Sequence, residues 1–159
     1  MRPMILFVCT GNICRSPMAE ALLRARLDRD EARRDWRVTS AGTLTAGGGP
    51  ASAYAIAEMA ERGINLRSHR ARRISRRLME ESDLVLAMAQ SHVEVLETIF
   101  PAHAHKVHLL SEMTGQKYSV SDPYGGSRLE YAYIAQELEQ LIDGGYERIV
   151  ALVEAAADG

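Results

Sequence analysis

The stretch Val8-Cys-Thr-Gly-Asn-Ile-Cys-Arg-Ser-Pro17 joins a bare apolar run, Met4 to Val8, to a segment with helical apolar periodicity. An uninterrupted apolar run of this kind predicts a fully buried parallel strand. The pair Ser16-Pro17 is typical of a helix start, with serine as the cap, and we expect this helix to extend to about Leu27. The residues between strand and helix therefore form a loop at the carboxyl end of a strand, where α/β sheets bind ligands.

This loop has the composition of a phosphate site with a nucleophile. Its backbone N–H groups can point inward at a helix N-terminus, and the same positive field favours the thiolate form of Cys9. Arg15, six positions after Cys9, can bind two phosphate oxygens with its planar guanidinium. Ser16 can donate a hydrogen bond to the sulfur, and Asn12 tolerates a left-handed backbone conformation. The residues that we expect to bind phosphate are Thr10, Gly11, Asn12, Ile13, Cys14, Arg15 and Ser16.

Strands and helices alternate along the rest of the chain, which predicts a three-layer α/β fold with a parallel sheet and helices on both faces. We treat residues 1–159 as a single domain, because no repeat, low-complexity tract or domain boundary interrupts them. The further predicted strands are Trp36 to Ser40, Asp83 to Met88 and Lys106 to Leu110. The further predicted helices are 51–62, 91–100, 128–142 and 146–156, with Gly144-Gly145 as a break between the last two.

Composition excludes several classes of protein. A net charge of −2 gives no general reason to expect nucleic acid or an anionic membrane as a partner. Two cysteines, Cys9 and Cys14, are too few for a disulfide framework and lack the spacing of a zinc site. The apolar runs are too short for a membrane span or a signal segment. We therefore expect a monomeric cytoplasmic protein that needs neither a metal nor a cofactor.

The segment Phe7-Val-Cys-Thr-Gly-Asn-Ile-Cys-Arg-Ser-Pro-Met-Ala-Glu20 resembles the active-site signature of the low-molecular-weight protein tyrosine phosphatases. The resemblance covers nearly the whole chain. It implies a four-stranded parallel sheet flanked by helices. It also implies hydrolysis of a phosphorylated protein or peptide through a phosphocysteine, with inorganic phosphate as the product. The other matching segments follow in the family's order, and they are Ser40 to Thr43, Gly63 to Asn65, Ser68 to Arg72, Asp83 to Met88 and Asp122 to Gly126.

The same resemblance assigns further roles. Asp122, on a loop stiffened by Pro123, corresponds to the general acid that protonates the leaving group and the base that activates water. Ser40 and His69 correspond to residues that brace Asn12 and the phosphate loop.

Cys14 has two interpretations. It is either a small residue that fills the loop, or a partner that traps oxidised Cys9 as a disulfide and protects it from irreversible oxidation. The family's use of this second cysteine as a redox guard favours the latter.

The substrate is a choice between two branches of the family. The segments 78–88 and 122–126 are more similar to the bacterial protein-arginine phosphatases. Those enzymes tend to carry threonine at the position of Ile13, whereas isoleucine gives an apolar wall suited to a phenyl ring. Leu44 lies in the loop where tyrosine-specific members usually have an aromatic residue. We expect Leu44 and Tyr124 to form the pocket wall, with Tyr124 as its aromatic part. We favour phosphotyrosine, with phosphoarginine as the alternative.

Two other classes of function use the same loop. Arsenate reduction requires further cysteines, and none follows Cys14. A phosphate-binding module without catalysis would have no use for a nucleophile, a clamp and an acid together.

Overall fold

The computed structural model describes residues 2–159 and contains one four-stranded sheet in which every pairing is parallel. The strands are β1 (Met4–Cys9), β2 (Arg37–Gly42), β3 (Leu84–Ala87) and β4 (Val107–Leu109), in the spatial order β2-β1-β3-β4. The observed strands lie within two residues of the predicted ones. The predicted parallel α/β architecture is confirmed.

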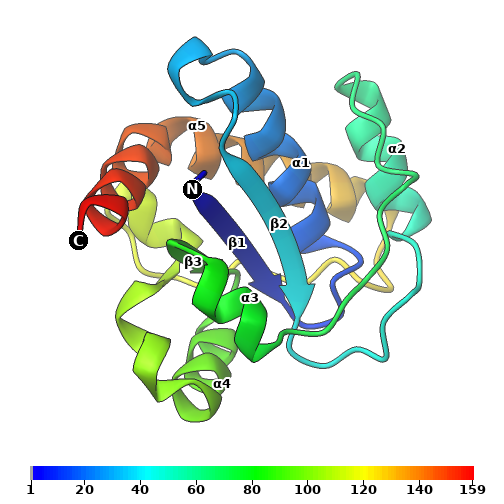
Figure 1. Ribbon diagram of the computed structural model, residues 1–159. Helices are drawn as coiled ribbons and strands as arrows, with labels where there is room; N and C mark the ends of the chain where they lie inside the picture. The colour runs from blue at the N-terminus through cyan, green and yellow to red at the C-terminus, as the bar shows by residue number, and fades with distance from the viewer. Residues whose placement is uncertain (1) are drawn as a thin grey trace.

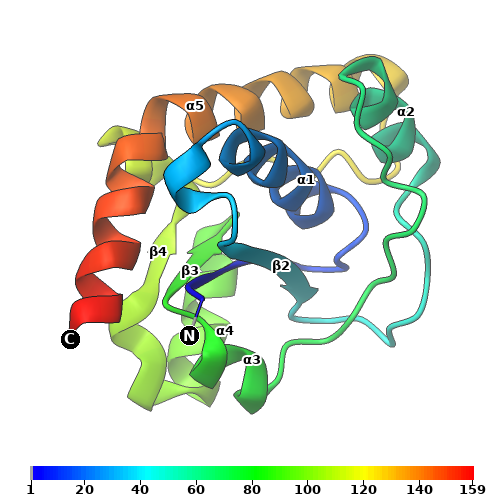
Figure 2. The ribbon, with the colours of Figure 1, turned by 45° about the horizontal axis from the view of Figure 1, so that its top comes forward.

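Helices cover both faces of the sheet, as Figures 1 and 2 show. One face is covered by α1, α2 and α5, and the other by α3 and α4 (Figure 2). The sequence did not indicate α3 or the three short 3₁₀ helices, all of which are six residues or shorter. The helices are α1 (Arg15–Asp28), α2 (Ala53–Glu61), α3 (Arg76–Glu81), α4 (Gln90–Ile99), α5 (Arg128–Asp158), η1 (Glu31–Arg33), η2 (Pro101–Lys106) and η3 (Leu110–Thr114).

Strand β1 is central and buried on both faces, which explains its bare apolar sequence. Ile5 and Phe7 pack into the core formed with α1, α2 and α5. Leu6 and Val8 pack into the second core, formed with α3 and α4. These two cores fix the position of the carboxyl end of β1, where Cys9 lies.

The start of α1 differs from the predicted start. The helix begins at Arg15 after Cys14, and no side chain caps it. Ser16 lies inside the first turn, and its hydroxyl lies 2.9 Å from Cys9 Sγ. The predicted capping role of Ser16 is therefore wrong, because this hydroxyl is used by the loop.

The predicted break at Gly144-Gly145 is also wrong, because α5 is one continuous helix of 31 residues. Its axis changes direction between its orange and red parts, and the glycine pair lies in that stretch (Figure 2). A Cβ atom on Gly145 would lie 2.5 Å from Met113 Cβ. Glycine is needed there because η3 packs against the helix, and a glycine pair permits a bend without ending the helix.

We predict that Gly145→Ala lowers the free energy of unfolding by about 1–3 kcal/mol, because the new methyl group overpacks against Met113. Gly144→Ala is the matched control, since its Cβ would meet only the Thr114 methyl group, at 3.3 Å. The control should gain up to about 1 kcal/mol from helix propensity. Urea unfolding measures the free energy of unfolding of both variants. Equal effects of the two substitutions would contradict the close packing of Gly145 against Met113.

Candidate active site

The loop between β1 and α1 wraps around the sulfur of Cys9. The thiol is 2% exposed and receives a hydrogen bond from Asn12 N at 3.3 Å. Ser16 Oγ lies 2.9 Å from the same sulfur. Asn12 has a φ of 58°, the left-handed conformation predicted from the sequence. Donors from the loop and the helix thus point at the sulfur, an arrangement that favours negative charge on it.

Arg15 lines the same cavity as this thiol, and one nitrogen of its guanidinium has no partner in the described part of the chain. The residue is 5% exposed, and its Nη1 donates to Val120 O at 2.8 Å. Its Nη2 lies 3.4 Å from Asp122 Oδ2. Its Nε is buried and has no partner among residues 2–159. A buried N–H group without an acceptor is costly, so this nitrogen is suited to an oxyanion that binds in the cavity.

Asp122 is held at the mouth of the cavity by its own loop. Its Oδ1 accepts a hydrogen bond from Tyr124 N at 3.0 Å, and its side chain is 46% exposed. The loop is attached to the end of β3, because Val120 N donates to Met88 O at 2.8 Å. The carboxylate therefore faces both solvent and the guanidinium of Arg15.

A buried carboxylate fixes the other end of this loop. Glu58 on α2 is 2% exposed and accepts from Arg128 at the start of α5, with 2.6 Å between Arg128 Nη2 and Glu58 Oε2. Arg62 also pairs with Glu58, at 3.2 Å. Two guanidinium groups around one buried carboxylate hold α2 and the start of α5 together.

The cavity in front of Cys9 has a volume of about 200 Å³. Most of the predicted site residues line it. Tyr124 is 68% exposed at its mouth. Leu44 is 74% exposed and is not among the lining residues, so the structure does not bring it to the predicted wall. The lining residues are Cys9, Thr10, Gly11, Ile13, Cys14, Arg15, Asp122 and Tyr124.

Asn12 is the residue on which the loop is braced. It is fully buried, and its Nδ2 donates to Ser40 Oγ at 2.9 Å and to Ser16 Oγ at 2.8 Å. Its Oδ1 accepts from Arg72 N at 2.9 Å, and its carbonyl oxygen lies 2.8 Å from His69 Nε2. Ser40 and His69 thus contact the residue that the family resemblance assigned to them.

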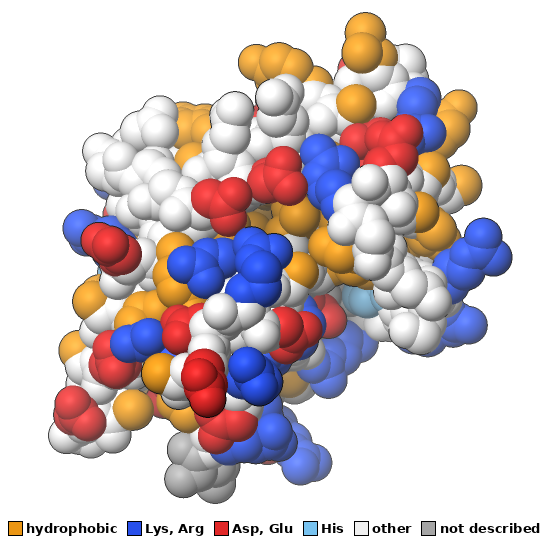
Figure 3. Space-filling view, turned by 90° about the horizontal axis from the view of Figure 1, so that it is seen from above, with side chains coloured by type: hydrophobic (Ala, Val, Ile, Leu, Met, Phe, Trp, Pro, Cys, Tyr) orange, Lys and Arg blue, Asp and Glu red, His pale blue; other side chains and the backbone are white. Residues whose placement is uncertain are grey.

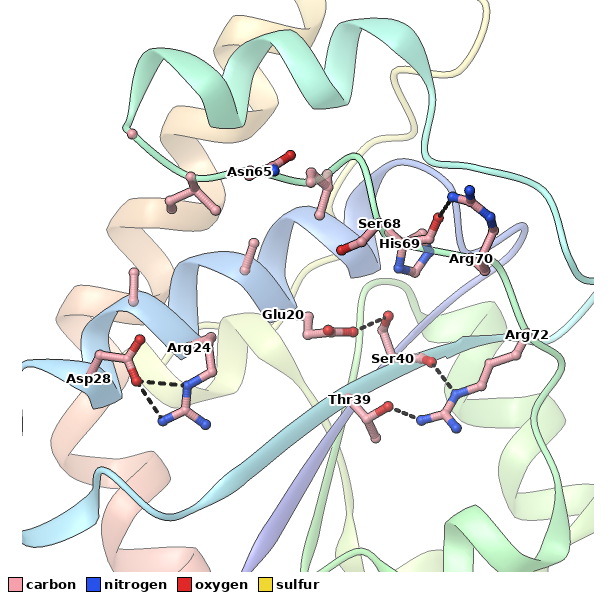
Figure 4. Close-up of a pocket in the computed structure, with 15 residues that line it drawn as sticks. Glu20, Arg24, Asp28, Thr39, Ser40, Asn65, Ser68, His69, Arg70 and Arg72 are labelled. Carbon is pink, nitrogen blue, oxygen red and sulfur yellow. Dashed lines mark hydrogen bonds and ion pairs between the residues drawn. The ribbon is translucent and has the colours of Figure 1, made fainter.

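Ser40 is itself held from two sides, as Figure 4 shows. Its hydroxyl donates to Glu20 Oε1 of α1 at 2.6 Å. Its carbonyl oxygen accepts from Arg72 Nε at 3.2 Å. The brace therefore includes two charged residues, Glu20 and Arg72, for which the sequence analysis assigned no role.

The cavity in Figure 4 is larger, about 690 Å³, but it lies behind the phosphate loop. Ser40 and His69 are among its lining residues, whereas Cys9, Arg15 and Asp122 are not. No cysteine is among its lining residues. Size alone would therefore select the wrong cavity, and the smaller one in front of Cys9 is the candidate site.

His92 is a site residue that the sequence analysis missed. It is 3% exposed at the start of α4, and its Nε2 lies 2.8 Å from Thr10 Oγ1. Burial, and to a smaller extent the positive charge of Arg15, lowers the pKa of His92 to about 4. The sequence could have indicated His92 only through the expected pairing of β1 with β3, which brings the residues after both strands together.

Cys14 is buried between the loop, α5 and the segment before α2. It is 3% exposed, and its sulfur lies 3.2 Å from Tyr131 Oη and 3.5 Å from Ser52 Oγ. Burial raises the pKa of the Cys14 thiol, so this residue is a neutral thiol at pH 7. Both cysteines are free.

Acidic and basic side chains are mixed on one face of the molecule. Figure 3 shows acidic and basic side chains interspersed with hydrophobic ones on the face seen from above. Together with the net charge of −2, this distribution means that affinity for an anion has to come from the local geometry around Cys9.

Among residues 2–159, no three His, Cys, Asp or Glu side chains are grouped as metal ligands would be. No helix among them combines the length and the apolar character of a membrane span.

Comparison with known proteins agrees with this geometry. The family described as low molecular weight phosphotyrosine protein phosphatase matches residues 4–155. The protein-arginine-phosphatase of Bacillus subtilis (strain 168) is 40% identical over 139 residues, which are 87% of this chain and 91% of that protein. The crystal structure of a low molecular weight protein tyrosine phosphatase from T. tengcongensis is 40% identical, with a TM-score of 0.86, and covers 92% of this chain and 99% of its own.

A third relative carries a phosphoryl group at its active site. The YwlE arginine phosphatase, as a cysteine-to-serine mutant with a phosphorylated active-site serine, is 36% identical with a TM-score of 0.84. The match covers 93% of this chain and 95% of that one. Overall identity does not separate the two substrate branches, since a relative of each kind reaches 40%.

The lowered pKa of His92 predicts how stability depends on pH. The unfolded chain protonates this residue near its ordinary pKa of about 6.5. The folded protein does so only at about 4. Between these values the unfolded state binds more protons, so the free energy of unfolding falls as pH falls from about 6.5 to about 4, by a few kcal/mol in total.

Urea unfolding between pH 7 and pH 4.5 measures this slope. His92→Asn removes the titrating group, so its free energy of unfolding should fall less over the same interval. Identical slopes for the two proteins would show that His92 is not the cause.

Proposed function

Because this chain belongs to the low molecular weight phosphotyrosine protein phosphatase family, we propose that it hydrolyses phosphotyrosine in proteins through a phosphocysteine intermediate on Cys9. One observation carries the proposal. Cys9 and Arg15, whose buried Nε has no partner within residues 2–159, line the same small cavity, with Asp122 at its mouth. A nucleophile, an oxyanion clamp and an acid are the three groups that phosphoryl transfer to cysteine requires.

In the first step, the phosphate group binds to the loop N–H groups and to Nε and Nη2 of Arg15. The Cys9 thiolate attacks phosphorus, and its electron pair forms the S–P bond. The P–O bond to tyrosine breaks, and its electron pair goes to the phenolic oxygen. Asp122 in its acid form gives that oxygen a proton, so the leaving group departs as a neutral phenol.

In the second step, the Asp122 carboxylate removes a proton from a water molecule. The water oxygen attacks phosphorus, and the S–P electron pair returns to Cys9 as the thiolate. Asn12 N and Ser16 Oγ stabilise the returning charge. Inorganic phosphate is the product, and the free enzyme is restored without a metal or a cofactor.

The walls of the cavity favour phosphotyrosine. Ile13 and Tyr124 provide apolar surface on which a flat phenyl ring can pack. The absence of Leu44 from the lining leaves this part of the rim open. Protein-arginine phosphatase activity by the same steps is the second candidate, because the Bacillus subtilis relative is as similar as the tyrosine phosphatase structure.

Cys14 fits the role of a redox guard for Cys9. An oxidant such as peroxide would convert Cys9 to a sulfenic acid. The Cys14 sulfur would then attack the Cys9 sulfur, with loss of water, to form a disulfide that thiols can reduce. The raised pKa of Cys14 keeps it protonated until then. Two free thiols suit a reducing compartment, so we place the protein in the cytoplasm.

Substitutions separate catalysis from binding. Cys9→Ser and Arg15→Ala should reduce turnover of a phosphotyrosine peptide below detection, and Asp122→Asn should lower kcat by about 10²–10⁴. Cys14→Ser compares the second cysteine of the loop and should lower kcat far less than Cys9→Ser, because Cys14 is not the nucleophile. If Cys9→Ser retains turnover, or if no form turns over while inorganic phosphate binds, the chain is a phosphate-binding module.

The preferred substrate is identified by measuring kcat/KM for two peptides that differ only in the phosphorylated residue, which is phosphotyrosine in one and phosphoarginine in the other. We predict that phosphotyrosine is preferred, and that Ile13→Thr shifts the ratio towards phosphoarginine by removing apolar wall. A preference of the unmodified enzyme for phosphoarginine would establish the second candidate instead.

A further inference from the structure

His92 and Thr10 form a partly buried contact between the segments that follow β1 and β3, two adjacent parallel strands. Thr10 follows β1, and His92 lies in the first turn of α4, which follows β3. His92 Nε2 lies 2.8 Å from Thr10 Oγ1, and His92 is 3% exposed. The steps proposed above do not use either side chain.

The protonation of the histidine ring follows from its second contact. The backbone N–H of Ala89 donates to His92 Nδ1 at 3.1 Å. Nδ1 therefore accepts and carries no proton, so the proton of the neutral ring lies on Nε2. His92 Nε2 must then donate to Thr10 Oγ1. A pKa of about 4 agrees with a neutral ring at pH 7.

The Thr10 hydroxyl has a second donor on its other side. Arg15 Nη2 lies 3.5 Å from Thr10 Oγ1. These two are the partners of the hydroxyl among residues 2–159. Both of its lone pairs face donors, so its own proton has to point elsewhere, and Thr10 is one of the residues that line the cavity.

We propose that His92 is a positioning residue that acts through Thr10: it holds the Thr10 hydroxyl as an acceptor for Arg15 Nη2 and leaves the hydroxyl proton for the bound phosphoryl group. The Thr10 hydroxyl is thereby an additional phosphate ligand. This inference rests on the function proposed for the same cavity, because the anion that it serves is the substrate's phosphoryl group.

The neutral state of His92 is part of this arrangement. Arg15 Nη1 donates to Val120 O at 2.8 Å, and Nη2 has Thr10 Oγ1 at 3.5 Å and Asp122 Oδ2 at 3.4 Å, so Nε, which has no partner among residues 2–159, is the guanidinium nitrogen left for the anion. The Thr10 hydroxyl, which accepts from the neutral imidazole of His92, is an uncharged acceptor for Arg15. A second carboxylate at this position, in addition to Asp122, would repel phosphate.

The test uses variants that separate the two contacts of His92. His92→Asn keeps an acceptor near the position of Nδ1 for Ala89 N and removes the donor to Thr10. His92→Gln restores a donor near the position of Nε2. Thr10→Val removes the hydroxyl at nearly constant shape, Thr10→Ser restores it, and His105→Asn, an exposed histidine in η2, is the control.

Two quantities are measured per folded enzyme, namely kcat/KM on a phosphopeptide and the affinity for inorganic phosphate by calorimetry. We expect His92→Asn and Thr10→Val each to lower both by about tenfold, the size of one lost hydrogen bond to a charged group. The double variant should lose about tenfold as well, since both substitutions remove the same link. His92→Gln and Thr10→Ser should recover most of the loss, and His105→Asn should match the unmodified protein.

Three results would overturn the proposal. These are unchanged phosphate affinity in Thr10→Val, multiplied losses in the double variant, or losses explained by a smaller folded fraction in urea unfolding. If the unmodified protein binds phosphate but hydrolyses neither peptide, the proposed function fails, while the phosphate affinities of the variants still decide the role of His92.

Discussion

Asn12 holds three separate parts of the chain to the phosphate loop, and the geometry around Cys9 depends on it. From a fully buried position it bonds to Ser16 in α1, to Ser40 in β2 and to the segment that contains His69 and Arg72. Its left-handed backbone costs roughly 1–2 kcal/mol. Its four hydrogen bonds, at about 1 kcal/mol each, are sufficient to offset that cost.

The conformation that Asn12 imposes gives the loop its chemistry. The loop turns its own N–H towards the Cys9 sulfur and brings Arg15, at the start of α1, to the same cavity. The second support comes from the far side, where Val120 O and Thr10 Oγ1 fix the two ends of the Arg15 guanidinium. An anion that enters the cavity therefore meets donors that are already in place, which is how electrostatic preorganisation lowers a barrier.

The sequence predicted what depends on local pattern, namely β1, the loop that follows it and the alternation of strands and helices. Burial on both faces makes β1 apolar at every position, so its pattern is unambiguous. The glycine pair at 144–145 was misinterpreted because its cause is the packing of Met113, a contact between residues far apart in the sequence. The role of His92 and the position of Leu44 outside the cavity depend on how strand ends and loops meet in space. No spacing in the sequence indicates that arrangement. The roles of Ser40 and His69 came from family resemblance, since neither periodicity nor composition selects them.

The central claim is that the phosphoryl group passes through the sulfur of Cys9. The most direct measurement is rapid acid quenching of the enzyme during turnover of a phosphotyrosine peptide, followed by mass spectrometry of the peptide that contains Cys9. We expect one added phosphoryl group on Cys9. With an aryl phosphate whose leaving group departs without a proton, such as p-nitrophenyl phosphate, Asp122→Asn should accumulate more of it, because its hydrolysis step lacks a base. Turnover with Cys9 unmodified at every quench time, or a phosphoryl group on another residue, would contradict the mechanism.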